Sequence, residues 1–351
     1  MSGGVDSSVA LSKVLEMGHD AIGITMKLWN NKDPKTNTVR PSLCNSADAI
    51  NGAKLICDRL GVKHYTIDFI DLFKKYVVDD FVSQYMNGKT PNPCVKCNSM
   101  IKWDALIKFS QEIEADFIAT GHYAQIKKIE GEFILSKGID ASKDQSYMLW
   151  DIDKKQLSKT LFPIGGMTKQ EVREYAIKHD LETANRAESQ DLCFVLGDDY
   201  SQFLYEIDPD KMANISDGPI VDEENNKVGM HKGFTSYTVG QRKGLGLSFP
   251  EPRYVKKINP INNTIVVSKK DALYSNRCTA HSINLLKDDV AFPANIMAQI
   301  RYNSKPSLAK IEINADDEIN IEFENPQLAI TPGQSIVFYE DNTLIGGAII
   351  K

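Results

Sequence analysis

The first eight residues form a short stretch of small and polar side chains that is followed at once by an apolar helical pattern. They read Met1-Ser2-Gly3-Gly4-Val5-Asp6-Ser7-Ser8. Two adjacent glycines let the backbone turn tightly and bring its N–H groups close to an anion, and the serine hydroxyls add further donors. A helix that begins just after them points its positive end at the same place. The stretch therefore favours either a cradle for nucleotide phosphates or an ordinary helix cap.

Helical and strand-like patterns alternate over the first third of the chain. Helices are predicted at residues 5–17, 46–60, 70–86 and 98–113, and strands at 21–28, 62–67 and 116–119, with a polar loop at 30–45. This alternation is typical of a doubly wound parallel α/β sheet, whose ligands sit at the carboxyl ends of the strands. A phosphate loop of this kind normally follows a buried strand. Because none precedes Met1, we expect the first strand of the sheet to lie outside this sequence.

The remaining two thirds of the chain change in texture. A hairpin is predicted at residues 124–137 around Glu130-Gly131, and two helices after it, one of them at 169–178. From about residue 201, prolines, glycines and Asn/Asp clusters become frequent and long helical patterns disappear. A second hairpin turns at Asn262-Asn263. Short β runs at turn-signalled spacing then predict a small C-terminal barrel or sandwich; they lie at 296–302, 308–313, 319–323, 335–339 and 344–350.

The composition narrows the class of protein. Hydrophobic residues make up 42% of the 351 residues and charged residues 25%, as in ordinary globular proteins. No apolar run is long enough to span a bilayer, and no signal peptide is visible, so we expect a cytoplasmic protein with no membrane partner. The net charge of −6 argues against broad coating of nucleic acid but allows RNA to bind at a local basic patch.

The six cysteines are more informative than the overall composition. In a cytosolic chain of this size they indicate buried thiols, metal ligands or redox groups rather than a disulfide scaffold. They are Cys44, Cys57, Cys94, Cys97, Cys193 and Cys278.

A Cys-x-x-Cys pair stands in the stretch Thr90-Pro91-Asn92-Pro93-Cys94-Val95-Lys96-Cys97-Asn98. Two prolines predict a stiff loop that presents both thiols, and Lys96 can lower their pKa values and raise the thiolate fraction. Such a pair can be a redox couple, half of a zinc site or part of an iron–sulfur site. A zinc site would need a second close pair, which the sequence lacks. Cys193, in Glu188-Ser189-Gln190-Asp191-Leu192-Cys193-Phe194, is the other candidate, although taken alone it reads as a buried apolar residue.

Taken in order, these motifs resemble those of the tRNA-specific 2-thiouridylases, the MnmA family. The Ser-Gly-Gly-Val-Asp-Ser loop resembles the PP-loop of the ATP pyrophosphatase superfamily, and it lacks the Gly-Lys-Ser/Thr ending of a Walker A loop. The resemblance covers essentially the whole chain. Its further motifs are Asn92-Pro93-Cys94-Val95-Lys96-Cys97-Asn98, Thr120-Gly121-His122-Tyr123-Ala124, Lys143-Asp144-Gln145-Ser146-Tyr147, Phe162-Pro163-Ile164-Gly165, Cys193-Phe194, Tyr237-Thr238-Val239-Gly240-Gln241-Arg242-Lys243-Gly244-Leu245-Gly246 and Arg301-Tyr302.

The resemblance implies that sulfur replaces the C2 oxygen of the wobble uridine in tRNA. ATP, with Mg²⁺, would adenylate the carbonyl, because AMP leaves far more readily than a urea-like oxygen. Sulfur would arrive as a persulfide on one cysteine, from a sulfur carrier or a cysteine desulfurase, and a second cysteine would help to release it. The partner would be the anticodon loop of tRNA. We expect a PP-loop catalytic domain at residues 1–200, a small central domain at 201–270 and a tRNA-contacting β-barrel at 271–351.

The resemblance also assigns roles residue by residue. Residues Met1 to Ser8 would bind ATP, with Met26 contacting adenine and Gly121 lining the nucleotide site. Cys97 would be the nucleophile and Cys193 the persulfide carrier, and the two would end as a disulfide. The target base would face Asn92, Pro93 and Cys94, with His122 beside it. The other implied tRNA contacts are Lys143, Asp144, Gln145, Arg301, Tyr302 and Gln334.

Read from their own chemistry, some of these residues keep two interpretations. A structural hydrogen bond accounts for His122 as well as catalysis does. Lys143 and Asp144 could be a solvated surface pair. Arg301 and Tyr302 combine a phosphate-binding fork with a stacking ring, which suits splayed single-stranded RNA.

Cys94 departs from the pattern of those family members that carry Asp at this position. Cys94, Cys97 and Cys193 together could bind a [4Fe–4S] cluster with one iron open to sulfide. The alternative is the two-cysteine persulfide route, with Cys94 a bystander or a resolving thiol. The persulfide route ends in a disulfide that must be reduced, whereas the cluster route need not. Both routes remain open at this point.

Two other functions compete with thiolation. One is a different PP-loop ATPase, such as an amidating ligase or a tRNA lysidine-type enzyme, but those lack two separated reactive cysteines and a C-terminal β domain. The other is a non-catalytic RNA-binding or metal-storage protein, which would have no need of a pyrophosphate cradle.

Overall fold

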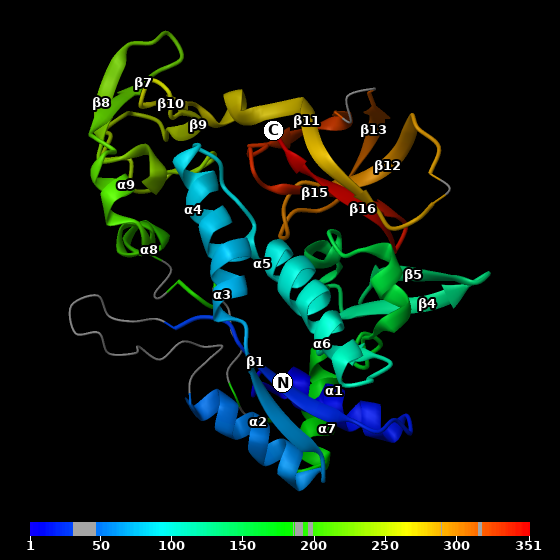
Figure 1. Cartoon of the computed structure of the whole chain (residues 1–351). Helices are drawn as coiled ribbons and strands as arrows, with labels where there is room; N and C mark the ends of the chain where they lie inside the picture. Colours follow the sequence, from blue (N-terminus) through cyan, green and yellow to red (C-terminus); the bar gives the residue numbers. More distant parts are fainter. Residues whose placement is uncertain (31–46, 185, 187–191, 196–198, 289, 315–317) are drawn as a thin grey trace. The chain divides into compact units, whose positions relative to one another are not determined.

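The computed structural model of the chain describes all residues except 31–46, 185, 187–191, 196–198, 289 and 315–317 (Figure 1). Its contacts divide the chain into two units. Unit 1 consists of Met1–Val77, Cys94–Asp198 and Asn342–Leu344. Unit 2 consists of Val78–Pro93, Asp199–Asp341 and Ile345–Lys351. No helix in the described part of the chain is both long and apolar enough to cross a membrane.

Unit 1 begins with the predicted alternation of helices and parallel strands. Its first elements are α1 (Val5–Glu16), β1 (Ile22–Lys27), α2 (Ala47–Arg59) and β2 (Lys63–Asp68). Strands β1 and β2 pair in parallel, and so do β3 (Ile118–Ala119) and β6 (Thr160–Leu161). One apolar cluster joins α1, α2 and α7 (Lys169–Lys178) through Val9, Ile56 and Val172, each of them fully buried. These pairings confirm the predicted α/β fold, while the predicted loop at 30–45 lies almost wholly outside the described residues.

The helix that carries the Cys-x-x-Cys pair begins earlier than the sequence suggested. It runs through α5 (Pro93–Lys96), the π-helical segment η2 (Cys97–Ala105) and α6 (Leu106–Glu112). Cys94 and Cys97 therefore lie on a helix and not on a stiff loop, which corrects the prediction. Proline fits the first helical position because its ring fixes φ and its missing N–H would have no partner there. A similar π-helical segment, η1 (Lys74–Val78), interrupts the predicted helix at 70–86 between α3 (Ile70–Phe73) and α4 (Asp79–Met86).

The second half of unit 1 contains a hairpin and short helices. Strands β4 (Ala124–Ile129) and β5 (Glu132–Lys137) pair around Glu130 and Gly131, which both have positive φ, as the Glu-Gly signal predicted. The 3₁₀ turns η3 (Ser146–Leu149) and η4 (Lys154–Lys159) follow, and then α7. Helix α7 has the predicted bounds because Thr168 and Glu171 form a capping box at its start.

Unit 2 contains a four-stranded sheet in the order β8-β7-β10-β9. The strands are β7 (Gly218–Val221), β8 (Lys227–His231), β9 (Tyr254–Asn259) and β10 (Thr264–Ser268), and their core includes Ile220, Val255 and Ile265. The predicted hairpin is confirmed, with Asn263 at positive φ in its turn. The helices α8 (Tyr200–Ile207) and α9 (Pro209–Ala213) and the 3₁₀ turn η6 (Phe234–Ser236) were not predicted.

The C-terminal strands form a closed six-stranded barrel, which confirms the β-barrel prediction. Their order is β11-β14-β13-β12-β15-β16, and β16 pairs back to β11. Ile311, Phe323 and Phe338 fill its core. Strand β11 was missed because its polar, half-exposed residues do not alternate cleanly. The elements are η7 (Lys270–Leu273), β11 (Tyr274–Leu285), β12 (Ala294–Gln299), β13 (Ser307–Ile313), β14 (Ile319–Leu328), β15 (Ser335–Glu340) and β16 (Thr343–Ile350).

Candidate active site

The N-terminal loop is held in shape by its own hydroxyl groups. Ser7 Oγ accepts from the Ser2 backbone N–H at 3.2 Å and donates to the Gly4 carbonyl at 3.1 Å. Ser8 Oγ donates to the same carbonyl at 3.0 Å. Gly4 is the N-cap of α1 and offers no side-chain cap to the first turn. The backbone N–H groups at the start of α1 therefore suit an external anion, which also meets the positive end of the helix.

Two glycines allow close packing around this loop. Gly3 has φ +73°, and a Cβ there would lie 2.5 Å from the Ala49 carbonyl oxygen. A Cβ on Gly121 would lie 2.8 Å from the carbonyl carbon of Asp6 and 2.9 Å from the nitrogen of Ser7. Any side chain at Gly3 or Gly121 would therefore push the loop out of place. The close approach of Gly121 puts the end of β3 directly against the loop, at the ligand-binding edge that the sequence predicted.

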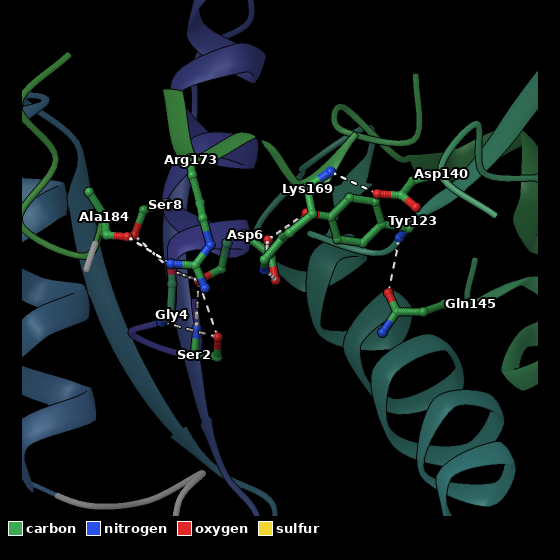
Figure 2. Close-up of polar contacts among 11 residues, drawn as sticks. Ser2, Gly4, Asp6, Ser8, Tyr123, Asp140, Gln145, Lys169, Arg173 and Ala184 are labelled. Atoms are coloured by element: carbon green, nitrogen blue, oxygen red, sulfur yellow. Dashed lines mark hydrogen bonds and ion pairs between the residues drawn. The ribbon is translucent and has the colours of Figure 1, made fainter. Parts of the chain in front are cut away.

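The carboxylate of Asp6 is neutralised inside unit 1. Lys169 Nζ lies 2.7 Å and 2.8 Å from its two oxygens, and the Tyr123 hydroxyl donates to Oδ1 at 2.8 Å. Figure 2 shows Lys169 and Tyr123 both pointing at Asp6, with Asp140 accepting from the Lys169 backbone. The loop can therefore carry a carboxylate without repelling phosphate. Lys169 was missed because it stands 163 residues from Asp6.

Asp144 and Gln145, two predicted tRNA contacts, form internal hydrogen bonds. Asp144 Oδ1 accepts from the backbone of Gly138 at 2.9 Å, and its Oδ2 accepts from Ser146 Oγ at 2.8 Å. Gln145 Oε1 accepts from the Tyr123 backbone at 3.0 Å (Figure 2). These bonds stabilise the turn on which Lys143, the third predicted contact of this motif, stands half-buried.

The three cysteines of interest differ in exposure. Cys94 is exposed, Cys97 is buried and Cys193 is half-buried. Phe194 anchors the Cys193 segment by packing edge-on against Phe73 of α3, with ring centroids 5.6 Å apart. Within the described part of the chain, no three His, Cys, Asp or Glu side chains are grouped closely enough to hold a metal ion. The three thiols are therefore not arranged as cluster ligands in this structure.

The remaining cysteines have no evident role in chemistry. Burial raises the pKa of the Cys57 thiol, and it raises the pKa of Cys278 to about 12. Both therefore stay protonated at neutral pH, as poorly reactive thiols do. Cys44 lies outside the described residues.

Lys96, which the sequence suggested as the activator of the thiols, is turned to a carboxylate. Its Nζ lies 3.1 Å from Asp151 Oδ2, and Ser99 Oγ donates to the same oxygen at 2.9 Å. The neighbouring Asn98 is buried and donates to the Met148 carbonyl at 2.8 Å, which ties the segment to η3. The charge of Lys96 is thus compensated by a partner that the sequence did not reveal.

His122 is buried against the rings of Trp103 and Phe162. Burial, with a smaller contribution from the charge of Lys102, holds its pKa well below the usual 6.5. The ring is therefore neutral at physiological pH. Lys102 Nζ donates to Nε2 at 3.5 Å, so Nδ1 carries the proton and donates to Thr120 Oγ1 at 2.8 Å.

The predicted tRNA contacts of unit 2 surround a turn of the barrel. The Arg301 guanidinium donates to the Ala329 carbonyl and, at 3.1 Å, to Thr331 Oγ1, while the neighbouring Tyr302 is exposed. Gln334 Nε2 donates to the carbonyl of Thr90 at 2.8 Å and to that of Pro91 at 3.2 Å.

The same turn also hydrogen-bonds to the backbone N–H of Thr90. The Thr90 N–H donates to the Pro332 carbonyl at 2.9 Å. Gly333 has φ +90°, and a Cβ on it would lie 3.0 Å from the Thr90 nitrogen. The barrel therefore fixes the residues that directly precede Asn92 and Pro93, of which Asn92 is half-buried and Pro93 buried.

Comparison with known proteins identifies the family. Family profiles match residues 1–197 (tRNA methyl transferase HUP domain), 207–269 (tRNA methyl transferase PRC-barrel domain) and 275–350 (Aminomethyltransferase beta-barrel domain). The tRNA-specific 2-thiouridylase MnmA of Clostridium kluyveri is 42% identical over 351 residues, which cover 100% of this chain and 97% of the relative. The proteins of the same name from Carboxydothermus hydrogenoformans and Clostridioides difficile are 42% and 41% identical, with 100% of this chain and 96% of each relative covered.

The chain belongs to the tRNA-specific 2-thiouridylase family.

Membership of the 2-thiouridylase family confirms the resemblance drawn from the motifs and makes the chain a sulfurtransferase enzyme. It excludes the non-catalytic storage protein and favours thiolation over the amidating-ligase alternative. The individual site residues remain predictions, because family membership does not test them one by one. Sequence reasoning missed two residues that contact predicted site residues: Lys102, which bonds to His122, and Lys169, which bonds to Asp6. Lys102 could have been noticed by its position five residues after Cys97, but nothing in the sequence links Lys169 to Asp6.

Proposed function

We propose that this chain replaces the C2 oxygen of the wobble uridine of tRNA with sulfur, and that it cleaves ATP to AMP and pyrophosphate to do so. The main support is the N-terminal loop, where a turn containing glycines presents the uncapped start of α1 and the single carboxylate is already neutralised by Lys169. This arrangement favours a polyphosphate as ligand. The relatives are named for 2-thiolation of tRNA, which agrees with the proposal.

The first step is adenylation. The uridine O2 attacks the α-phosphorus of ATP, the bond from that phosphorus to the bridging oxygen breaks, and pyrophosphate leaves. The residues Met1 to Ser8 would bind the phosphates. Met26, at the carboxyl end of β1, would contact adenine, and Gly121 would line the site from the end of β3. The base must leave its stack in the anticodon loop to reach this edge of the sheet.

Mg²⁺ would reach this site on the phosphates of ATP. It prefers octahedral oxygen ligands and commonly takes one or two carboxylates with the substrate phosphates. Asp6 is the carboxylate of the loop, and both of its oxygens are bonded to Lys169. The loop is therefore not a preformed magnesium site, and the phosphates of ATP would supply most of the oxygen ligands of the ion.

The second step transfers sulfur. The terminal sulfur of a persulfide on Cys193 attacks C2, and AMP leaves with the former carbonyl oxygen. The Cys97 thiolate then attacks the Cys193 sulfur. Their new disulfide bond replaces the persulfide S–S bond, whose electron pair goes to the thiocarbonyl. A dithiol reductant must then reduce the Cys97–Cys193 disulfide before the next turnover.

The persulfide route is preferred because it needs two thiols and not a gathered set of three. A [4Fe–4S] cluster would require Cys94, Cys97 and Cys193 to converge, and in the described part of the chain they do not form such a group. Anaerobic purification with iron and sulfide assays tests this choice. An active, iron-free enzyme supports the persulfide route, whereas activity that rises and falls with iron content would overturn it.

The proposed tRNA-binding residues are those that the motifs indicated. Asn92, Pro93, Cys94 and His122 are proposed to surround the target base, and Lys143, Asp144, Gln145, Arg301, Tyr302 and Gln334 to form the wider tRNA site. Asp144, Gln145 and Gln334 would act mainly by shaping backbone, because their side chains bond to it. A sulfur carrier or cysteine desulfurase would load Cys193. We place the protein in the cytoplasm and keep the proposed domain bounds at 1–200, 201–270 and 271–351.

The proposal is tested by mass spectrometry of tRNA nucleosides from a bacterium that lacks its own 2-thiouridylase. Expression of this chain should restore wobble 2-thiouridine, and Cys97→Ser or Cys193→Ser should abolish that restoration. Cys278→Ser is the matched control, because this cysteine lies in the barrel. If the wild-type chain is expressed and folded but restores no 2-thiouridine, the proposed function is wrong.

A further inference from the structure

Lys102 is a half-buried cation without a carboxylate partner in the described part of the chain. Among the described residues, its hydrogen-bond partner is neutral His122, at 3.5 Å. Lys96 and Lys169, the other lysines of this region, each pair with an aspartate. Desolvating an ammonium group without a counter-charge costs free energy. Lys102 thus carries charge that a bound anion could neutralise.

The π-helical geometry of η2 accounts for Lys102 lying on the same face of the segment as Cys97. In an α-helix, residues five apart point in directions that differ by about 140°. The i→i+5 bonding of a π-helix widens each turn, so that the fifth residue returns close to the direction of the first. Cys97 opens η2 and Lys102 stands five residues later. The segment therefore presents the thiol and the ammonium on one face, which an α-helix would not do.

Lys102 is also connected to the phosphate loop through the residues that follow β3. Its partner His122 directly follows Gly121, whose backbone packs against Asp6 and Ser7 with no room for a side chain. The Lys102 charge also contributes to the low pKa of the Met1 amino group, about 6, although burial is the main cause and Cys57 opposes it. Lys102 is therefore linked through His122 and Gly121 to the loop that would hold ATP.

We propose that Lys102 is a catalytic residue of the adenylation step, in which its ammonium stabilises the charge that develops on the α-phosphate. The inference rests on the proposed function. The step balances without a proton from Lys102, because the bond from O2 to phosphorus forms as the bond to pyrophosphate breaks. His122 is a positioning residue, since its neutral Nε2 accepts from Lys102 and leaves the positive charge available to the phosphate. The same ammonium remains beside AMP when sulfur displaces it.

A purely structural role for Lys102 makes a different prediction. If the lysine served only to satisfy His122, any donor at this position would replace it. Lys102→Gln keeps an N–H donor for His122 but removes the charge. Lys102→Arg keeps the charge in another shape. Lys108→Met is the matched control, because Lys108 is an exposed lysine on the following helix, α6, and pairs with the neighbouring Asp104.

The test is a rapid-quench measurement of pyrophosphate release in a single turnover, with the purified full chain, ATP and unmodified tRNA. ATP and tRNA dissociation constants and the thermal midpoint are measured on the same samples. Lys102→Gln should release pyrophosphate about 100-fold more slowly, as when one charge-stabilising donor is removed from an active site. Its ATP affinity should change less than about threefold, because the charge acts on the transition state. Lys102→Arg should release pyrophosphate at about a tenth of the wild-type rate, and Lys108→Met should match wild type.

A Lys102→Gln rate within about threefold of wild type would overturn the inference. The inference would also be overturned if Lys102→Gln and Lys102→Arg lowered the thermal midpoint equally and the slower rate followed from this loss of stability. The two proposals fail separately. If wild type shows no tRNA-dependent pyrophosphate release, the adenylation proposed above is wrong; if wild type releases pyrophosphate and Lys102→Gln equals it, only the role of Lys102 is wrong.

Discussion

The phosphate loop of unit 1 and the Arg301–Gln334 region of unit 2 use similar polar residues in opposite ways. At the loop, Lys169 neutralises Asp6, and the start of α1 is left without a side-chain cap. In unit 2, the donors of Arg301 and Gln334 bond to backbone carbonyls of Ala329, Thr90 and Pro91. The first region retains hydrogen-bonding capacity for a ligand, whereas the second uses it to shape the chain. Polar side chains that motifs assign to substrate binding can therefore act in two ways: some are left to bind a ligand, and others hold the backbone in place.

This difference predicts different consequences of mutation. Substitutions of the reacting cysteines in unit 1 should remove chemistry and leave stability nearly unchanged. Substitutions in the Arg301–Gln334 region should lower stability and weaken tRNA use together, because the same bonds that fix the turn also fix the residues ahead of Asn92 and Pro93.

The largest effect is expected at Cys97. Cys97→Ser should lower thiolation by roughly 10³-fold or more, since removing a nucleophile leaves only the contribution of binding. The change is nearly isosteric, so the thermal midpoint and ATP affinity should stay close to wild type. Single-turnover formation of 2-thiouridine and differential scanning calorimetry measure the two effects. If Cys97→Ser still thiolated tRNA, Cys97 would not be the nucleophile, and the contrast drawn between unit 1 and the Arg301–Gln334 region would be wrong.

Cys94→Ser sharpens the same result, because Cys94 is the exposed thiol three residues earlier on the same helix. The persulfide route predicts a loss of less than about tenfold, since only Cys97 and Cys193 exchange bonds. Loss as large as that of Cys97→Ser would instead identify Cys94 as an essential ligand or thiol.

A smaller effect is expected at Arg301, and it has two parts. Arg301→Lys keeps the charge but loses the planar fork that bonds Ala329 and Thr331. It should lower the free energy of unfolding by about 1–2 kcal/mol and leave the salt dependence of tRNA binding unchanged. Arg301→Gln should lower stability similarly and reduce the salt slope by about one, as expected for one lost phosphate contact. An unchanged slope in Arg301→Gln would make the residue solely a support of the turn.

At Gln334 the effect should be smaller again. Gln334→Glu has the same shape but lacks both donors to the carbonyls of Thr90 and Pro91. We expect a loss of about 1 kcal/mol in stability and thiolation about fivefold slower, with ATP affinity unchanged. Gln327→Glu is the matched control, because Gln327 donates to a local carbonyl, that of Asn325, on the exposed part of β14. Equal effects of both substitutions would show that the bonds to Thr90 and Pro91 are not special.

The smallest effect is a change in the pH dependence of stability. Burial lowers the pKa of His122, so between that lowered pKa and the ordinary 6.5 the unfolded chain binds a proton that the folded chain does not. Stability should therefore fall as pH drops below about 6.5, by at most about 1.4 kcal/mol per pH unit for this group. His122→Gln should flatten the slope between pH 5 and 7, and the surface variant His179→Gln should not. Equal slopes in wild type and His122→Gln would contradict a neutral, buried His122.

Local signals predicted much of the fold. Helix α7 has the predicted bounds, and the structure shows a capping box of Thr168 and Glu171 at its start. The β4–β5 hairpin was predicted because Glu-Gly is a turn signal. The helical start at Pro93 was missed, since two prolines close together suggested an extended loop. Strand β11 was missed because its pattern of burial is irregular.

The site was harder to predict than the fold, because its essential pairs are distant in sequence. The motifs pointed to Asp6, Cys97 and His122, but Lys169 stands 163 residues from Asp6, and Gln334 stands 244 residues from Thr90. Lys96 and Lys102 look alike in the sequence, and only the three-dimensional structure shows that one pairs with Asp151 while the other lacks a carboxylate in the described part of the chain. The tertiary contacts decide which hydrogen-bond donors pair within the protein, and these contacts join residues that are far apart in the sequence.

The central claim is that one chain couples cleavage of ATP to thiolation of tRNA, and the most direct measurement is the stoichiometry of the two products. Purified protein, ATP, unmodified tRNA and a persulfide donor are mixed for a single turnover, and pyrophosphate and 2-thiouridine are quantified together. The account predicts equal amounts with wild type. With Cys97→Ser it predicts pyrophosphate release without 2-thiouridine. Formation of 2-thiouridine without pyrophosphate release would contradict it.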